Sequence, residues 1–524
     1  MDAEVLIVGA GPTGLMMANQ LARRNVRSIL IDRHAGPARE TRALGVQART
    51  LEIYARLGIV ERALELGVRG TGADLWANGR KTARVPLGQA GANVTPYPYI
   101  LILGQDANEK IMGEKLRGFG QSVQWNTELT ALTQDADGVT ATVKRTDGGT
   151  QTLRVGWVTG CDGAHSAVRK ACSIPFEGAP YEHVFFVADT EVTGNMVPNE
   201  VNVYLWKSGF HLFFPMKGTD HWRVVGIFPD GVDPEGATFE SVLPSIRSEA
   251  GAGLDFKACS WFSTYRIHHR AATRFRERRC FLLGDAAHIH SPVGAQGMNT
   301  GLQDSYNLAW KLALVCEGRA DPALLDSYEA ERLPVAQRLL ETTDRAFRLI
   351  VSDSWLAGLL RTRVLARLAA FVMKRPRIQA FAFRTVSQTG IHYRESHLSQ
   401  TAGAMGDKAP SAGDRFPWLK VAFKKGGPVE DLFEKLDDTR FTMLFIGQEA
   451  PAEIVASLAG VANSHVIPAD DANPAAFDAA GLPYPSYYLL RPDGHVGLCG
   501  RLPDTTVIER YLSSRIGMTR PAGG

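Results

Sequence analysis

Apolar residues near the start of the chain follow two different periods. Val5-Leu6-Ile7-Val8 is an uninterrupted apolar run, as in a strand that is buried on both faces of a parallel sheet. Between residues 12 and 22 the apolar positions recur every three or four residues, which indicates a helix. A second apolar run, from Ser28 to Ile31, ends at Asp32. The pattern therefore predicts a strand–helix–strand unit of an α/β fold.

Further along, the pattern divides the chain into segments. Alternation between residues 123 and 158 indicates paired strands. From 176 to 270 aromatic and β-branched residues alternate, which favours a sheet inserted into the N-terminal unit. The predicted parts are an N-terminal α/β unit over 1–175 and 271–345, an inserted mixed or antiparallel sheet over 176–270, a helical linker over 346–400, and a C-terminal α/β unit over 401–524.

The predicted linker, residues 346–400, mixes leucine and alanine with many arginines. A helix that lies on a membrane surface would have this composition. A connecting helix with its apolar side packed and its arginines solvated would have it too. We favour the connecting helix and therefore expect no insertion into a membrane.

Composition excludes some classes of function. The 524 residues carry a formal net charge of +3 and 45% hydrophobic residues, typical of a globular protein without a nucleic-acid partner. No run of about 18 apolar residues predicts a transmembrane helix, and the N-terminus lacks the features of a signal peptide. Six scattered cysteines without a C-x-x-C pair favour buried free thiols and a cytoplasmic location.

Three glycines, Gly9, Gly11 and Gly14, follow the first strand. In this context the first permits a tight turn, the second lets the backbone approach a pyrophosphate, and the third lets the helix pack on the strand. Asp32 lies 23 residues after Gly9, close to the spacing of the acidic residue that binds a ribose hydroxyl. The motif predicts a dinucleotide site without distinguishing FAD from NAD. The residues expected there are Gly9, Gly11, Pro12, Thr13, Gly14, Asp32 and Arg33.

Two later segments have the composition of cofactor-binding turns. Cys161-Asp162-Gly163 precedes a helical pattern that begins near His165, and an Asp-Gly turn that caps this helix would also explain it. The segment 284–304 begins with Gly284-Asp285 after an apolar strand and holds three more glycines. A loop that serves packing alone is the alternative. A strand-end aspartate beside several glycines favours close approach to a phosphate or a polyol.

These three elements, in this order, resemble the class A flavoprotein monooxygenases, the aromatic hydroxylases of the para-hydroxybenzoate hydroxylase type. The resemblance covers about residues 1–345. The remainder is similar to the larger phenol and polyketide hydroxylases, in which a segment like 388–393 precedes a thioredoxin-like domain. The resemblance implies a Rossmann-like FAD-binding domain, an inserted substrate-binding sheet and a thioredoxin-like C-terminal domain.

The resemblance also implies residue roles. The glycine motif and Asp32 would hold the ADP half of FAD, and Asp162 would touch both FAD and the nicotinamide cofactor. Pro292 would place its carbonyl beside the reacting ring of the substrate, as part of the catalytic site. The further residues implied at the flavin half of the cofactor are Arg42, Gln105, Leu129, Asp285, Gly294, Gln296, Gly297, Met298 and Asn299.

In the resembled family, NADPH or NADH reduces the flavin, which reacts with O₂ to give a C4a-hydroperoxide that hydroxylates a phenolic or polycyclic aromatic substrate. The aromatic-rich stretch near 200–230 suits a substrate wall. Tyr204, His211 and Phe213 are the candidate substrate contacts there, and His211 is the candidate base for a phenol. Each of the three would also fit as an ordinary core or rim residue.

Other functions remain open at the level of sequence. The same cofactor elements would serve Baeyer–Villiger or epoxidation chemistry on a polyketide, or a non-catalytic flavin-binding redox sensor. His288 and His290 suggest no metal site, because no carboxylate or thiolate completes a recognisable ligand set. The C-terminal unit has only Cys499, so it would serve packing or contact in a homodimer rather than dithiol exchange.

Overall fold

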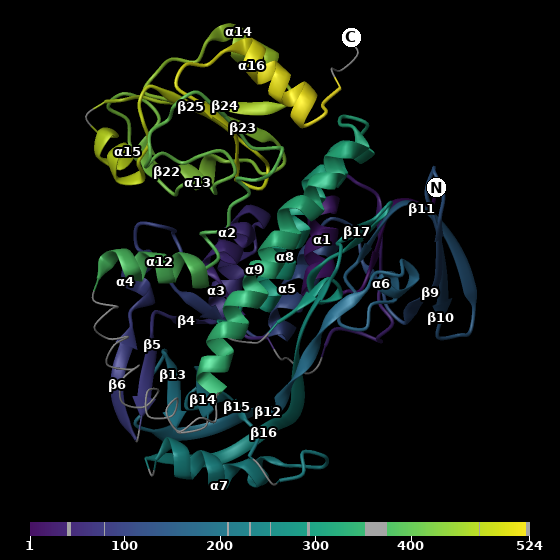
Figure 1. The fold of residues 1–524 in the computed structure, drawn as a ribbon, viewed down its shortest axis with the longest axis vertical. Coiled ribbons are helices and arrows are strands. Elements are labelled where there is room, and N and C mark those ends of the chain that lie inside the picture. Colours follow the sequence, from purple (N-terminus) through teal and green to yellow (C-terminus); the bar gives the residue numbers. More distant parts are fainter. Residues whose placement is uncertain are drawn as a thin grey trace.

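The computed structural model describes residues 1–38, 43–77, 79–206, 209–229, 232–251, 253–290, 294–351, 375–470 and 472–519. Figure 1 shows three parts stacked along the long axis, with the N-terminal α/β unit in the middle, an open sheet below it and the C-terminal unit above it. The long helix α9 (Asp326–Val351) crosses the middle part and reaches toward the open sheet.

The middle part is built on a sheet with the strand order β17-β18-β11-β1-β2-β8, from which β10 and β9 branch at β11. Strand β1 is parallel to both of its neighbours, so the predicted strand–helix–strand unit is confirmed. The strands of this sheet are β1 (Ala3–Val8), β2 (Ser28–Ile31), β8 (Val123–Gln124), β9 (Thr127–Gln134), β10 (Val139–Arg145), β11 (Thr150–Gly160), β17 (Arg276–Glu277) and β18 (Cys280–Leu282).

Helices cover this sheet because their apolar faces complete its core. Helix α1 (Pro12–Ala22) is buried over most of its length and packs against α5 (Gln105–Gly118) and α8 (Gly297–Cys316). The other elements of the middle part are α2 (Ala48–Leu57), α3 (Val60–Leu66), α4 (Leu87–Gly91), α6 (Ala167–Ala171), α12 (Pro376–Val386), η1 (Gly284–Ala286), η2 (Pro322–Leu325), and the small sheet of β3 (Gly45–Val46), β7 (Ile100–Ile102) and β4 (Val68–Gly70).

The open sheet has the strand order β19-β16-β12-β15-β14-β13-β5-β6. It extends beyond the predicted range of 176–270, because β5, β6 and β19 come from segments that the sequence pattern places in the N-terminal unit. Helix α7 (Phe239–Ala250) covers the face turned away from the middle part (Figure 1). The strands are β5 (Ala73–Ala77), β6 (Arg80–Val85), β12 (Phe176–Gly194), β13 (Val201–Trp206), β14 (Gly209–Pro215), β15 (His221–Ile227), β16 (Leu254–Ala272) and β19 (His288–Ile289).

The C-terminal unit is a second α/β unit, built on a sheet with the order β20-β26-β25-β23-β24. Strand β23 is parallel to β24 and antiparallel to β25. Its elements are β20 (Gln400–Ala402), β21 (Lys420–Ala422), β22 (Val429–Asp431), α13 (Leu432–Lys435), β23 (Phe441–Ile446), α14 (Ala452–Ser457), β24 (Ala462–Ile467), α15 (Pro474–Ala480), β25 (Ser486–Leu490), β26 (Val496–Gly500), α16 (Thr505–Arg510) and η4 (Tyr511–Arg515).

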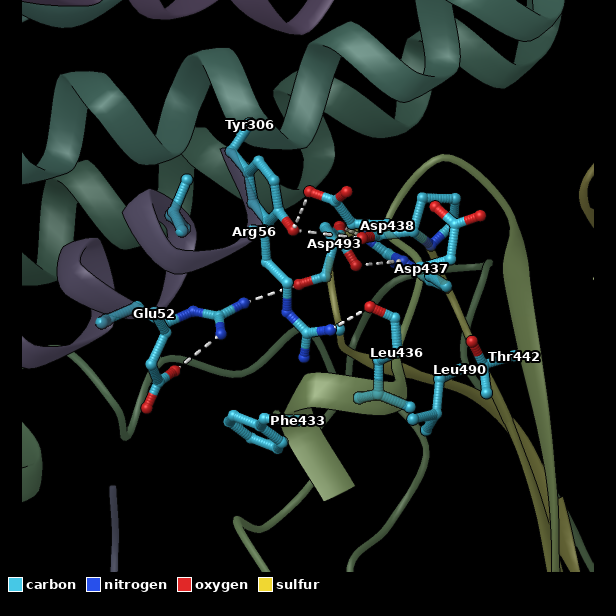
Figure 2. A pocket seen from close by; sticks show the side chains of 15 residues that line it. Glu52, Arg56, Tyr306, Phe433, Leu436, Asp437, Asp438, Thr442, Leu490 and Asp493 are labelled. Atoms are coloured by element: carbon cyan, nitrogen blue, oxygen red, sulfur yellow. Dashed lines mark hydrogen bonds and ion pairs between the residues drawn. The ribbon is translucent and has the colours of Figure 1, made fainter. Parts of the chain in front are cut away.

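The C-terminal unit and the middle part share one apolar core. Trp310 and Leu314 of α8 are buried in the same cluster as Phe441 and Leu489 of the C-terminal sheet. Beside this core, the Tyr306 hydroxyl donates a hydrogen bond of 2.9 Å to Asp438, and Figure 2 shows the two side chains facing each other. The cavity at this seam is about 20 Å³, which is room for about one water molecule rather than a cofactor.

Candidate functional site

A cavity of about 830 Å³ opens at the carboxyl end of strands β1, β2 and β11, where parallel α/β sheets bind their ligands. It is formed by turns that lie far apart in the sequence. Predicted residues that line it are Gly9, Gly11, Asp32, Arg33, Gln105, Leu129, Asp162 and Asp285. The structure thus brings together residues from all three predicted cofactor segments.

Close backbone contacts leave no room for a side chain at two of the three glycines of this turn. A Cβ atom on Gly9 would lie 2.4 Å from the carbonyl oxygen of Cys161, and one on Gly14 would lie 1.8 Å from that of Gly9. A Cβ on Gly11 would meet no atom within 4 Å, because it would point into open space. Helix α1 begins directly after Gly11 without a side-chain cap. Its first N–H groups and its positive dipole end are therefore available to an anion.

Asp32, at the end of β2, stabilises the glycine turn by hydrogen bonding. One of its carboxylate oxygens accepts a hydrogen bond of 2.7 Å from the backbone N–H of Ala10. The other accepts one of 2.8 Å from the backbone N–H of His34. Asp32 thereby joins the glycine turn to the loop after β2, and it is one of the residues that line the cavity.

Asp162 caps a helix and also lines the cavity, so its contacts agree with one of the two predicted roles and leave the other possible. Its Oδ2 accepts hydrogen bonds from the backbone N–H groups of Ala167 (2.6 Å) and Val168 (3.2 Å), which caps helix α6. Its Oδ1 is buried and has no hydrogen-bond partner among the described residues, although the side chain lines the cavity. Burial raises the pKa of this carboxyl. An oxygen of this kind fits a donor on a bound cofactor.

The predicted residues 294–299 form the loop before α8 and its first turn, and none of them is among the residues that line the cavity. The Asn299 side chain holds this loop, since it accepts from the Gln47 backbone (2.8 Å) and donates to the carbonyls of Gly45 and Ala295 (2.8 Å each). Thr13 of α1 lies against the same helix, because a Cβ on Gly301 would approach its hydroxyl to 2.4 Å. The first turns of α1 and α8 are therefore neighbours.

Two predicted residues, Arg42 and Pro292, lie outside the described residues. Several cavity residues were missed by the sequence reasoning. Glu109 is one of them: it lies one helical turn after Gln105, its carboxylate accepts from the Ala38 backbone (3.0 Å), and burial raises its pKa. The i to i+4 spacing on α5 would have identified it. The others include Trp125 and Thr127.

The predicted substrate contacts lie on the far face of the open sheet. Tyr204 stacks on Trp76 at 5.3 Å and packs edge-on against Phe213 at 5.2 Å. His211 is fully buried, and its Nε2 lies 3.0 Å from the Glu249 carboxylate of α7. Burial lowers the pKa of His211. The structure brings the three together with α7, and none of them lines the cavity or lies on the opposite face of the sheet.

That opposite face turns toward the middle part. Val203 and Phe214 are partly buried there in a cluster with Leu44 and Ala295, the latter from the 294–299 loop. Because side chains alternate between the two faces of a strand, the sequence would have placed Val203 and Phe214 on the face opposite to Tyr204 and Phe213. It does not say which face of a sheet turns toward the cofactor.

The described residues also bear on two other kinds of feature, a metal site and a membrane-spanning helix. No group of three or more His, Cys, Asp or Glu side chains there is arranged to hold a metal ion. Nor does any helix in those ranges combine the length and the hydropathy required to cross a bilayer.

Known proteins share this architecture. A family model described as FAD binding domain matches residues 2–343. The chain is 33% identical to the 6-methylpretetramide 4-monooxygenase of Streptomyces rimosus over 523 residues, which cover 98% of this chain and 93% of that protein. Among solved structures, the anhydrotetracycline hydroxylase OxyS of Streptomyces rimosus superposes with a TM-score of 0.79 at 29% identity and covers 99% of both chains.

Aklavinone-11 hydroxylase, solved as a ternary complex with FAD and aklavinone, superposes with a TM-score of 0.80 at 25% identity and covers 98% of this chain and 99% of its own. The family that the sequence motifs resemble is thereby confirmed. The chain belongs to the class A flavoprotein aromatic hydroxylases, and it is an FAD-dependent aromatic monooxygenase.

Proposed function

We propose that this enzyme hydroxylates a phenolic, polycyclic aromatic compound of the polyketide type, with NADPH or NADH as its electron donor. The observation that carries the proposal is the cavity in which Gly11, Asp32, Asp162 and Asp285 converge. Support for the substrate class comes from relatives named for 6-methylpretetramide and aklavinone, which match nearly the whole chain. We also propose that oxygen is transferred by the route that the resemblance to this family implies.

The residues of the cavity have separate roles in holding FAD. Gly11 and the first turn of α1 would bind the pyrophosphate through backbone N–H groups, and Asp32 would bind the adenosine ribose. Asp285 would bind the ribityl chain, and the loop before α8 would lie against the flavin ring. Bound FAD supplies the two-electron chemistry with O₂, and the protein orients the substrate and excludes water.

The substrate wall is proposed on the inner face of the open sheet. Phe214 and Val203 are only partly buried, and they pack toward Ala295 of the loop assigned to the flavin. An apolar wall at this position suits a flat aromatic ring. We therefore transfer the role of substrate contact from Tyr204, His211 and Phe213 to this face.

We propose that the C-terminal unit has a thioredoxin-like fold without thioredoxin chemistry. The strand order β26-β25-β23-β24, with helices α14, α15 and α16 between and after these strands, is the basis of that assignment. Its single cysteine, Cys499, is fully buried. Packing against α8 is therefore its proposed role.

The proposal is tested by a panel of phenols and polyketide aromatics, scored for faster oxidation of NADPH or NADH and for product mass. We expect FAD-containing protein, substrate-stimulated oxidation, and a product that has gained one oxygen atom with its rings intact. A ring-opened or lactone product would assign Baeyer–Villiger chemistry instead. Absence of stimulation across the panel, with FAD bound, would favour a non-catalytic flavin-binding sensor.

A further inference from the structure

One buried carboxylate lies directly beneath the turn that carries Asp285. The Oδ2 of Asp304, on α8, accepts a hydrogen bond of 3.0 Å from the backbone N–H of Gly284. The same oxygen lies 2.8 Å from Nε2 of His288. Gly284 precedes Asp285 and His288 follows it by three residues. One oxygen of the Asp304 carboxylate therefore contacts both ends of the turn.

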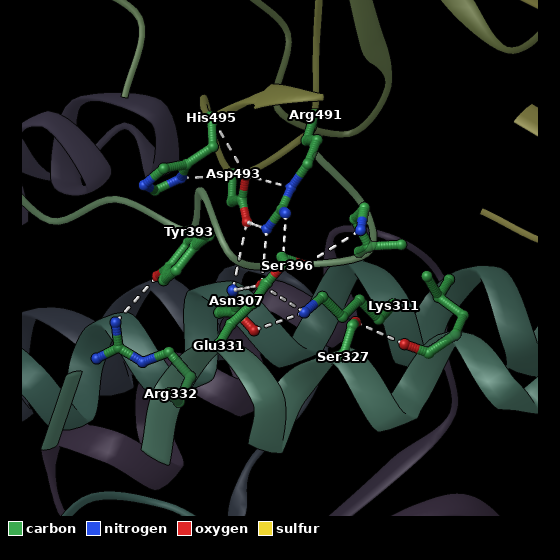
Figure 3. Close-up of polar contacts among 12 residues, drawn as sticks. Asn307, Lys311, Ser327, Glu331, Arg332, Tyr393, Ser396, Arg491, Asp493 and His495 are labelled. Atoms are coloured by element: carbon green, nitrogen blue, oxygen red, sulfur yellow. Dashed lines mark hydrogen bonds and ion pairs between the residues drawn. The ribbon is translucent and has the colours of Figure 1, made fainter. Parts of the chain in front are cut away.

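The second oxygen of this carboxylate is held by Arg332 of α9. The Arg332 Nε donates to Asp304 Oδ1 at 2.6 Å, and its two remaining nitrogens donate to the Tyr393 hydroxyl (3.0 Å) and the Thr300 carbonyl (3.2 Å). The bond to Tyr393 is drawn in Figure 3. Arg332 and Asp304 are both fully buried. Although burial opposes ionisation, Arg332 and His288 lower the pKa of Asp304 to about 2.

A buried ion pair is a costly way to gain stability alone, since apolar residues of the same size serve as well or better. Its advantage is geometric, because a guanidinium with several fixed donors holds a carboxylate in one orientation. Here that carboxylate contacts the turn and not merely another helix. Tyr328, also on α9, supports the strand before the turn, since its hydroxyl donates to the Leu282 carbonyl at 2.7 Å.

We propose that Asp304 and Arg332 are positioning residues for the flavin: they fix the turn 284–288, and through it the Asp285 carboxylate, in the geometry that binds the ribityl chain. The inference rests on the role proposed above for Asp285. Tyr393, from the segment that leads to the C-terminal unit, is the third member of the arrangement because it orients Arg332.

The neighbouring residue offers a matched control. The Glu331 side chain is as fully buried as that of Arg332, but it contacts the C-terminal unit and not the turn. It bonds to Lys311 (2.8 Å) and to Arg491 (2.6 and 2.9 Å), as Figure 3 shows. Glu331→Gln thus weakens a buried ion pair of the same helix without touching the turn.

The test compares Arg332→Gln, Arg332→Lys and Tyr393→Phe with Glu331→Gln. The readouts are the dissociation constant of FAD, the visible spectrum of the bound flavin, and the unfolding midpoint of the apoprotein. We expect Arg332→Gln to weaken FAD binding about tenfold or more and to change the spectrum, whereas Glu331→Gln lowers the midpoint and leaves both unchanged. Arg332→Lys should recover part of the affinity, and Tyr393→Phe should weaken binding by about twofold to fivefold.

The inference would be overturned if Arg332→Gln and Glu331→Gln both weakened FAD binding in proportion to the stability that each variant loses. If Arg332→Gln fails to fold, Tyr393→Phe decides, because an unchanged spectrum and affinity in that milder variant would overturn it as well. Failure of the unaltered protein to bind FAD would contradict the proposed function, which keeps the two results distinct.

Discussion

At the scale of single residues, the three glycines of the cofactor turn are not equivalent. Gly9 and Gly14 lie against backbone atoms, whereas Gly11 faces open space. Their spacing after a strand predicted a dinucleotide site, because the glycines of this motif serve the tight turn, the approach to a pyrophosphate and the helix packing. Glu109 follows Gln105 by one helical turn and could have been added to the prediction, whereas Trp125 and Thr127 could not, because they enter the cavity through tertiary packing.

Gly11→Ala should separate cofactor binding from folding. The added methyl group points into the cavity, so we expect an apoprotein of nearly unchanged stability that binds FAD at least about tenfold more weakly. Gly14→Ala places its methyl group 1.8 Å from the Gly9 carbonyl oxygen and should destabilise the apoprotein itself. Thermal unfolding and FAD titration of both variants check this. Equal destabilisation by the two would contradict the assignment of Gly11.

His211→Asn tests on which face the substrate lies. The histidine contacts α7, so we expect kcat/KM to stay within about twofold of the unaltered enzyme, whereas Phe214→Ala on the inner face should raise KM. The same variant tests a pH effect on stability. Because burial lowers the pKa of His211, the unfolded chain binds a proton at this histidine more readily than the native one. The free energy of unfolding should therefore fall as the pH drops below about 6.5, and His211→Asn should reduce that fall.

At the scale of elements, the interface between helices α8 and α9 contains buried polar pairs that the apolar pattern of the sequence does not predict. Lys311 and Glu331 are both fully buried, one on each helix, and Asn307 joins them. Hydrophobic periodicity predicted the strands and helices around the cavity, because their apolar faces must be buried. It could not predict this network, since buried charges are recognised only when their partners are known.

Lys311→Met should flatten the pH dependence of stability in alkaline solution. Burial, the largest influence, lowers the pKa of Lys311 to about 8 despite Glu331 beside it. Between about pH 8 and 10.5 the unfolded chain therefore binds more protons than the native one, so stability rises with pH across this window. Urea midpoints at several pH values check the slope in both proteins. An unchanged slope in Lys311→Met would assign the rise to another group.

At the scale of the whole molecule, the C-terminal unit is continuous with the enzyme core. Trp310, Leu314 and Leu324 are buried in one cluster with Phe441 and Leu489. The sequence predicted a separate unit after residue 400, because composition changes there. The shared core was not predictable, because the apolar face of α8 is divided between two sheets and periodicity does not show where each side chain packs.

Deleting residues 401–524 should therefore not release a working enzyme. The deletion exposes the apolar side of α8 and removes Arg491 from Glu331, so we expect an aggregating protein that retains little FAD. Size-exclusion chromatography and flavin absorbance measure both effects. As a control, a protease site inserted at the exposed Asp407 should yield two fragments that co-elute with FAD after cleavage. A soluble, fully loaded fragment 1–400 would contradict this prediction.

The pairing of Glu331 with Arg491 also has a consequence for synthesis on the ribosome. The two residues are 160 positions apart. At roughly 5 to 20 residues per second, the Glu331 carboxylate is made roughly 8 to 32 seconds before its arginine partner. During that interval the nascent chain holds Lys311 as its only described cationic partner for this carboxylate. The interface of α8 and α9 with the C-terminal unit can therefore close only after Arg491 has been translated.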